Sequence, residues 1–271
     1  NRLIIKTFRS FITMKLATWN VNSLNVRLPH VIDWLKQSEV DILCLQELKQ
    51  DNDKFPENEL NALGYHSYFN GQKTYNGVAI VSKYKLNNVR LDLPNFPDDT
   101  QKRFIAADYS FDNKNLTIIS AYIPNGQSLA SEKFKYKLIW LKKFIDYLEV
   151  LQKENNLITI TGDFNIAPEN IDCHDPDVWD GQVLVSDEER QMFRKILNLG
   201  FFDAFRLMNP NAAEYSWWDY RQAGFRRNLG MRIDHILLSN ELKDKIISSF
   251  IDKNPRKLER PSDHTPVVVE I

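Results

Sequence analysis

Polar side chains that can bind a metal ion or transfer a proton stand at the ends of strand-like apolar runs throughout this chain. They are Asn20 after Lys15–Trp19, Glu47 after Val40–Gln46, Asp163 and Asn165 after Leu157–Thr161, Asp234 within Met231–Leu238, and Asp263–His264 before Thr265–Ile271. Open α/β and sandwich folds build their active sites where strand ends converge. The distribution therefore predicts one site that is assembled from the whole chain.

The side chains at these positions carry mostly carboxylate and amide oxygens, with one histidine and no cysteine. Oxygen donors of this kind are typical of Mg²⁺ or Mn²⁺ sites rather than of zinc sites. The set therefore predicts phosphoester hydrolysis that depends on Mg²⁺, with Mn²⁺ able to substitute.

The apolar patterning predicts an α/β fold. Apolar stripes at helical spacing lie in residues 28–35 and 134–151, and Ser186 to Glu189 form a capping box that opens a third helix, with Gly200 after its end. Because strands outnumber helices and lie in separated groups, two packed sheets flanked by helices are expected. The runs that predict strands are Leu16–Trp19, Val40–Leu45, Gly77–Val81, Phe104–Tyr109, Leu116–Ile119, Leu157–Ile160, Ile233–Leu238 and Val267–Ile271.

Composition favours a single domain over residues 14–271. The 271 residues contain no linker-like or repetitive stretch, and 43% of them are hydrophobic, which can fill a sizeable core. Residues 1–13 carry basic side chains and no acid, so they are interpreted as a foreign or upstream-translated extension, or as the remnant of an organellar presequence. Only two cysteines occur and no apolar run approaches the ~18 residues of a membrane span. A soluble cytoplasmic protein is expected, or an organellar one if residues 1–13 are a presequence.

Two of the polar positions suggest a metal and a water. A carboxylate at Glu47, where a buried strand ends, is costly to desolvate unless a cation neutralises it, although the side chain could simply reach solvent. Asp163 and Asn165 are two residues apart, which on an extended segment places both on one face. The carboxylate would then polarise a water and the amide would donate to a phosphate oxygen. The alternative is an Asx turn after Gly162.

His264 stands in the sequence Pro-Ser-Asp-His-Thr-Pro and requires a carboxylate on its other ring nitrogen to fix its tautomer and charge. The neighbouring Asp263 is poorly placed for this, because adjacent side chains on an extended segment diverge. Asp234, from another strand, is the predicted partner, which leaves Asp263 to face the metal or to orient the loop.

In this order the motifs resemble the exonuclease III family of abasic-site endonucleases, within the endonuclease/exonuclease/phosphatase fold. The resemblance covers residues 14–271 and implies a four-layer, DNase I-like α/β sandwich of two mixed sheets. The matching stretches are Thr18–Leu24, Leu45–Lys49, Gly64–Tyr65, Asn76–Ile80, Ala121–Gly126, Thr161–Pro168, Tyr215–Tyr220, Met231–Asp234 and Pro261–Pro266.

The resemblance also implies roles for the site residues. Glu47 would be the principal Mg²⁺ ligand, with Asn20 close by to orient a ligand or phosphate. Tyr122, which follows the run ending at Ala121, would lie beside the scissile phosphate, and Asn125 would add a phosphate contact. Whether one or two metals act stays open. The residues that could hold a second metal are Asp163, Asn165, Asp263 and His264.

The net charge of −1 means that any DNA-binding surface must be a local basic face. The resemblance assigns an apolar pocket for an abasic sugar to Trp217, Ile233 and Met231, although Met231 departs from a tryptophan common in animal members. Gln127 replaces an arginine that wedges into DNA in some members. The expected backbone contacts are Lys102, Arg103, Arg221, Arg226 and Arg227.

A Mg²⁺-dependent DNA repair nuclease is therefore expected, acting as a monomer on double-stranded DNA with abasic sites or 3′ ends and not on a membrane. It would incise 5′ to abasic sites and have some 3′→5′ exonuclease and 3′-phosphatase activity. Because the same fold serves other phosphoesterases, RNA or a lipid or inositol phosphate stays open as substrate. A catalytically silent DNA-binding scaffold is a third alternative, against which the intact set of site residues argues.

Overall fold

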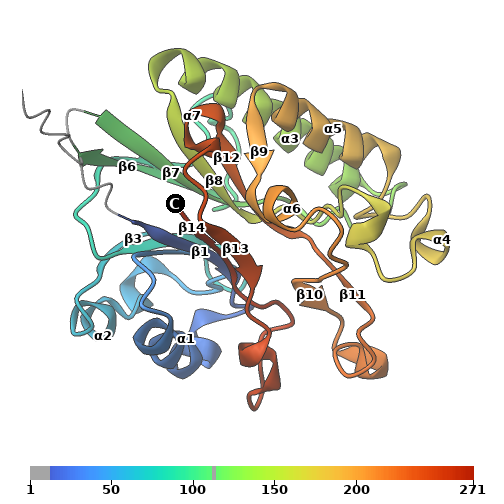
Figure 1. Ribbon diagram of the computed structural model, residues 1–271, viewed down its shortest axis with the longest axis horizontal. Coiled ribbons are helices and arrows are strands. Elements are labelled where there is room, and N and C mark those ends of the chain that lie inside the picture. The colour runs from blue at the N-terminus through green and yellow to red at the C-terminus, as the bar shows by residue number, and fades with distance from the viewer. Residues whose placement is uncertain (1–12, 112–113) are drawn as a thin grey trace, which may run out of the picture.

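The computed structural model describes residues 13–111 and 114–271, so the predicted extension lies outside the described residues apart from Thr13. Two six-stranded β-sheets pack face to face, and helices cover the outer face of each (Figure 1). The predicted α/β four-layer sandwich of two mixed sheets is confirmed. None of the helices in these two described stretches is long and apolar enough to span a bilayer.

The first sheet has the strand order β13-β14-β1-β2-β4-β3. The central strands β1 and β2 are parallel, and every other neighbouring pair in this sheet is antiparallel. The strands of this sheet are β1 (Lys15–Asn20), β2 (Ile42–Gln46), β3 (His66–Asn70), β4 (Val78–Ser82), β13 (Ser248–Ile251) and β14 (Val267–Glu270).

The second sheet has the order β5-β6-β7-β8-β12-β9, with β7 and β8 as its parallel pair. A short antiparallel ribbon of β10 (Trp217–Trp218) and β11 (Gly230–Met231) lies beside the two sheets (Figure 1). The strands of the second sheet are β5 (Asn87–Leu91), β6 (Phe104–Phe111), β7 (Lys114–Tyr122), β8 (Leu157–Asp163), β9 (Phe201–Asp203) and β12 (Asp234–Ser239).

Helices lie on the outer faces, with α1 and α2 against the first sheet and α3 and α5 against the second (Figure 1). The α-helices are α1 (Leu24–Ser38), α2 (Glu57–Asn61), α3 (Glu132–Glu154), α4 (Pro176–Trp179), α5 (Asp187–Asn198), α6 (Ala204–Met208) and α7 (Asn240–Lys243). The 3₁₀ turns are η1 (Asn52–Lys54), η2 (Asn170–Asp172), η3 (Arg221–Ala223) and η4 (Asn254–Lys257).

Apolar clusters fill the spaces between these layers. The inner faces of the two sheets meet through buried side chains such as Leu16, Ile80 and Ile118. A second cluster packs α3 and α5 onto the second sheet, and includes Phe144 and Phe193. Burial of apolar surface on both faces of each sheet explains why the central strands are nearly continuous apolar runs.

Strand direction places the polar motifs at one end of the sandwich. The carboxyl ends of the parallel strands β1 and β2, and of β7 and β8, all point the same way within their sheets. Since β12 runs antiparallel to β8, its first residue, Asp234, lies opposite the last residue of β8, Asp163. The strand β14 is antiparallel to β1, so the loop that precedes it reaches the same end. All five polar motifs therefore converge.

All the predicted strands and helices are present, with ends that differ by a few residues. The Ser186 capping box is formed, and Gly200 has a φ of 98° after the end of α5. The strands that the patterning missed in the two large sheets are β3, β5, β9 and β13, which are the four edge strands.

Candidate active site

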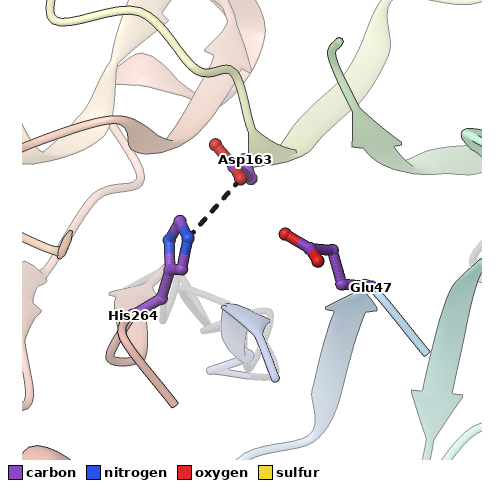
Figure 2. Close-up of side chains that lie close together, drawn as sticks. All are labelled: Glu47, Asp163 and His264. Carbon is purple, nitrogen blue, oxygen red and sulfur yellow. Dashed lines mark ion pairs between the residues drawn. The ribbon is translucent and has the colours of Figure 1, made fainter. Parts of the chain in front are cut away.

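The candidate site lies where the two sheets meet the loops that follow β1, β2, β7 and β8. Two carboxylates and one imidazole from three separate segments face one another there (Figure 2). Ligand atoms of Glu47, Asp163 and His264 all lie within 4.8 Å of one another, and His264 Nε2 is 3.7 Å from Asp163 Oδ2. This acidic, oxygen-rich set is suited to a hard divalent cation.

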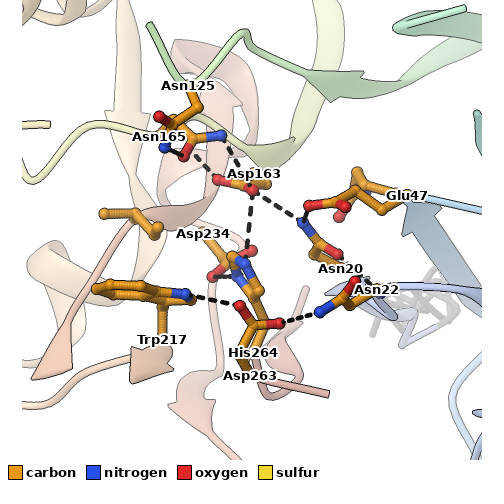
Figure 3. A network of polar contacts seen from close by, with 12 residues as sticks. Asn20, Asn22, Glu47, Asn125, Asp163, Asn165, Trp217, Asp234, Asp263 and His264 are labelled. Atoms are coloured by element: carbon orange, nitrogen blue, oxygen red, sulfur yellow. Dashed lines mark hydrogen bonds and ion pairs between the residues drawn. The ribbon is translucent and has the colours of Figure 1, made fainter. Parts of the chain in front are cut away.

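Asn20, the last residue of β1, connects the two carboxylates. Its Nδ2 donates to Glu47 Oε1 at 2.8 Å and to Asp163 Oδ2 at 2.9 Å (Figure 3). Its Oδ1 accepts the backbone N–H of Asn22 at 2.9 Å. With both Nδ2 hydrogens bound, Asn20 orients the two carboxylates in this conformation, and its Oδ1 is the atom that could ligate a cation.

Lys49 was not singled out from the sequence, although it lies within a conspicuous motif. Its Nζ is 2.9 Å from Glu47 Oε2 and 2.5 Å from Asn22 Oδ1. Glu47 itself has a φ of 54°, so a left-handed turn directs its carboxylate toward the site instead of along the strand. The spacing of Glu47 and Lys49, two residues apart after a buried strand, is the signal that could have identified the lysine.

The prediction placed Asp163 and Asn165 on one extended segment, but the chain turns directly after Asp163, the last residue of β8. Asn165 has a φ of 50°, and its backbone N–H donates to Asp163 Oδ1 at 2.8 Å, which is an Asx turn. The turn still brings the side chains together, since Asn165 Nδ2 donates to Asp163 Oδ2 at 3.2 Å. Asn125 Nδ2 extends the network by donating to Asn165 Oδ1 at 3.0 Å (Figure 3).

The imidazole of His264 is held between two aspartates. Its Nδ1 is 2.8 Å from Asp234 Oδ2, so the structure brings together the two residues predicted to pair. Ser216, which the sequence interpretation did not use, donates to the same Asp234 oxygen at 2.7 Å and accepts the Asp234 backbone N–H. Trp19 Nε1 donates to the backbone carbonyl of His264 and fixes the loop.

Burial and charge set the protonation of these groups. Burial lowers the pKa of His264, but the carboxylates of Asp234, Asp163 and Asp263 outweigh it and raise the pKa to about 10. Burial raises the pKa of Asp163 to about 7, against the opposing effect of His264. The imidazole is therefore a cation at neutral pH, and the Asp163 carboxyl titrates near neutrality in the metal-free protein.

Tyr122 ends β7 beside this cluster. Burial and then the Glu47 carboxylate raise the pKa of its phenol well above the ordinary value, so the phenol is a proton donor at neutral pH. The Arg103 guanidinium stacks over the Tyr122 ring, 4.6 Å from its centroid, and donates to its backbone carbonyl. Lys102 instead forms an ion pair with Asp92 at 2.8 Å, so of the two predicted basic residues Arg103 is the one in contact with a site residue.

Asp263 does not belong to the close group of Glu47, Asp163 and His264. Its Oδ1 accepts Asn22 Nδ2 at 2.9 Å, and its Oδ2 accepts Trp217 Nε1 at 3.0 Å (Figure 3). Of the two roles left open for Asp263, these contacts favour orientation of the loop. The Trp217 ring lies 6.5 Å from the ring of His264, so it forms the half-buried rim of the site.

The apolar residues predicted for a sugar pocket lie in one cluster. Trp217 packs against Ile233 and Met231, and the Cα register pairs Trp217 with Met231 across the β10–β11 ribbon. Met231 is fully buried and Ile233 is 1% exposed, so Trp217 is the member that presents surface. Met231 therefore supports the indole from beneath and contributes no open pocket wall in this conformation.

The three arginines of residues 221–227 that were predicted to contact DNA lie on an exposed segment. Arg221 forms a bidentate pair with Asp219, with an 85% exposed side chain. Arg226 and Arg227 are exposed. A buried arginine that the sequence interpretation missed, Arg256, donates to the carbonyls of Ser262 and Trp218 and packs over aromatic rings at the base of the segment. It ties the segment to the loop that carries His264.

This arrangement can perform acid–base chemistry on a bound phosphoester. A carboxyl that titrates near neutrality, Asp163, lies beside an imidazolium held by a second carboxylate. The side-chain amides of Asn125 and Asn165 border the same space (Figure 3), and the Tyr122 phenol lies close enough to Glu47 for the carboxylate to raise its pKa. Charge that develops on a phosphate would therefore meet fixed donors and a cation in a site from which most water is excluded.

Comparison with known proteins agrees with this geometry. Residues 17–264 match the Endonuclease/Exonuclease/phosphatase family. Exodeoxyribonuclease III of Haemophilus influenzae is 37% identical over 266 residues, which cover 95% of this chain and 99% of that protein. DNA repair nuclease APEX1 of Danio rerio is 30% identical over 94% of this chain and 81% of its own length.

Solved structures give the same result. The chain superposes with a TM-score of 0.92 and 46% identity on a 3′ phosphatase from Neisseria bound to a product DNA hairpin, over 95% of this chain and 99% of that one. An AP endonuclease from Archaeoglobus fulgidus gives a TM-score of 0.87 at 40% identity, over 94% of this chain and 98% of that one. The chain belongs to the endonuclease/exonuclease/phosphatase family, as a nuclease of the exodeoxyribonuclease III type.

Proposed function

We propose that this protein is a Mg²⁺-dependent DNA repair phosphodiesterase that incises 5′ to abasic sites in double-stranded DNA. We also propose that it removes nucleotides and phosphates from 3′ ends. The proposal rests on one observation above the others: the Asp163 carboxylate lies between Glu47 on one side and the His264–Asp234 pair on the other. A metal, an attacking water and a phosphate could meet at such a point.

Each residue has a role that follows from its contacts. Glu47 and Asp163 would hold the cation, which when bound neutralises charge on the phosphate and the leaving oxygen. Asp163 would also orient the attacking water and accept its proton. His264, kept cationic by Asp234, would stabilise the negative charge on the phosphate oxygens.

The remaining residues would hold the substrate. Asn165, Asn125 and Tyr122 border the site and would fix the phosphate in line with the water; in this conformation the Asn165 amide donates to Asp163 and to the Ile123 carbonyl and accepts from Asn125. Trp217, at the rim beside His264, would pack against a sugar that lacks its base. DNA as the substrate is supported by the exodeoxyribonuclease III and APEX1 relatives and by the Neisseria structure with a product DNA hairpin.

A single assay tests the function. A duplex with one tetrahydrofuran residue should be cut on its 5′ side, leaving a 3′-hydroxyl, when Mg²⁺ is present and not when EDTA is added. Parallel reactions with a single-stranded RNA and with a lipid or inositol phosphate should give far lower rates. Equal or faster cleavage of either would exclude a DNA-specific site. Binding of the duplex without cleavage under any metal condition would indicate a silent scaffold.

Binding of Mg²⁺ should depend on pH, because a cation requires the ionised form of Asp163. The raised pKa of about 7 means that Asp163 is mostly protonated at pH 6 and mostly ionised at pH 8. Affinity for Mg²⁺ should therefore be roughly tenfold higher at pH 8 than at pH 6. Isothermal titration calorimetry at both pH values measures this, with Asp163→Asn as the control that should bind weakly and equally at both. A wild-type affinity that does not change would contradict the role of Asp163.

Trp217→Ala should affect one activity more than another. An apolar rim accepts a small sugar that lacks its base, whereas the metal and phosphate contacts serve both reactions. Incision at abasic sites should therefore fall about tenfold more than degradation of normal 3′ ends, because the apolar surface of the sugar is no longer buried against the indole. Trp217→Phe is the matched control, since it keeps an aromatic face and loses only the bond to Asp263. Equal losses in both activities would make Trp217 a general positioning residue.

A further inference from the structure

A lysine and a glutamate that the proposed mechanism does not use are fully buried behind the site. Lys137 of α3 and Glu189 of α5 form an ion pair in which neither side chain has any exposed surface. Removing two charges from water is costly, and apolar residues in such places are often as stable or more so. Stability alone is therefore a weak reason for the pair.

The lysine is bound on every side. Its Nζ donates to Glu189 Oε1, to the backbone carbonyl of Asn165 at 2.7 Å and to the backbone carbonyl of Asn125 at 3.2 Å. These three contacts use all three ammonium donors. The glutamate is equally satisfied, because it also accepts the backbone N–H groups of Leu184 and Ser186 and the Ser186 hydroxyl.

Both carbonyls belong to residues whose side chains border the site. Asn165 and Asn125 are joined by a side-chain hydrogen bond, and Asn165 also donates to Asp163. Their segments follow different strands, β7 and β8, so the Lys137 ammonium joins two parts of the chain that are about 40 residues apart in sequence. Gly126, next to Asn125, is also tight against this group, since a Cβ there would lie 3.3 Å from Lys137 Cδ.

We propose that Lys137, held by Glu189, is a positioning residue that fixes the main chain of Asn125 and Asn165 and thereby the directions of their two side-chain amides. This inference rests on the proposed function for the role of the amides in holding phosphate. The lysine acts from behind the site and touches neither substrate nor metal. It links the helical layer of the second sheet to the phosphate-binding end of β7 and β8.

The kinetic test uses one double variant, in which both charges of the buried pair are removed together so that neither is left unpaired. Lys137→Met with Glu189→Gln in one chain should lower kcat on abasic duplex about 10- to 100-fold while KM changes less, as expected for misplaced groups. Adding Asn125→Ala and Asn165→Ala to this chain should cost little beyond those two changes alone, since all the changes act through the same two amides. Adding Glu47→Gln instead should multiply the losses. Multiplicative losses with the two asparagine changes would overturn the proposal.

Leu141→Ala is the matched control, because Leu141 is fully buried on α3 but lies in the apolar core. It should lower the melting temperature and leave kcat nearly unchanged. Hydrogen exchange adds a measurement that needs no activity. Segments 123–127 and 163–167 should exchange faster in the Lys137→Met, Glu189→Gln chain and not in Leu141→Ala.

The kinetic and the hydrogen-exchange experiments together distinguish a failure of the proposed function from a failure of the positioning role. Wild-type protein that cleaves no DNA would overturn the proposed function, whereas the exchange experiment would still decide whether Lys137 fixes these segments. Exchange that rises equally in the lysine variant and in Leu141→Ala would reduce the pair to an ordinary core contact. Unchanged kcat in the lysine variant of an active nuclease would also overturn the positioning role.

Discussion

His264→Asn should lower kcat by about three orders of magnitude, because it removes the cation that faces the phosphate. Asp234→Asn should cost about 100-fold, since the imidazole stays in place but loses the carboxylate that holds its proton. The double variant should be little worse than His264→Asn, because both changes remove one unit whose atoms lie 2.8 Å apart. Steady-state kinetics on an abasic duplex measure all three.

The pH profile adds an independent check of this pair. The pKa of His264 is raised to about 10, with Asp234 as its foremost raising neighbour, so wild-type His264 stays cationic through neutral pH. In Asp234→Asn the imidazole should lose its proton at lower pH, and activity should decline as pH rises through neutrality. Ser216→Ala is the control: it removes a donor to Asp234 and leaves the carboxylate. Multiplicative losses in the double variant would show that the two residues act separately.

Glu47→Gln should be the second large effect, and it should depend on metal concentration. The amide keeps the size of the side chain but removes a charged ligand, so kcat/KM should fall about 100-fold or more at limiting Mg²⁺. Part of the loss should be recovered at high Mg²⁺, because the remaining Asp163 carboxylate still attracts the cation. A titration of activity against Mg²⁺ concentration gives the result.

Glu132→Gln is the matched control for this prediction, since Glu132 has an 85% exposed side chain that pairs with Lys135 on α3. Its activity should follow the wild-type curve at every metal concentration. If Glu47→Gln also followed that curve at limiting Mg²⁺, Glu47 would be excluded from the metal site.

The sequence predicts the inner strands well and the outer strands poorly, for a physical reason. Central strands such as β2 and β4 are covered on both faces, so each is a run of buried apolar residues that stands out. The edge strand β5, Asn87–Leu91, is mostly exposed and alternates weakly, so its composition resembles a loop. Pairing with a neighbour, which no local pattern encodes, makes it a strand.

The residues of the candidate site also divide into those that the sequence identifies and those that it does not. Residues inside recognisable motifs, such as Glu47 and Asp163, could be selected because a charged group at the end of an apolar run requires an explanation. Lys137 and Arg256 could not be selected, because one belongs to an amphipathic helix and the other to an ordinary polar loop. Their contacts with distant carbonyls exist only after the layers have packed. The Asn165 turn was misjudged because its left-handed φ is invisible in the spacing.

The neighbouring positions of β1 and β14 have a consequence for the protein while it is being synthesised. Trp19 Nε1 donates a hydrogen bond to the carbonyl of His264, which lies 245 residues later in the sequence, and β1 pairs with β14. These contacts of β1 can therefore form only after residues 264–270 have been made. A chain leaves the ribosome from its amino end, so every partial product that ends before residue 264 lacks the imidazole of His264. The nascent chain can thus pair β1 with β2 before it contains His264, and the proposed hydrolysis would require that residue 264 has been made.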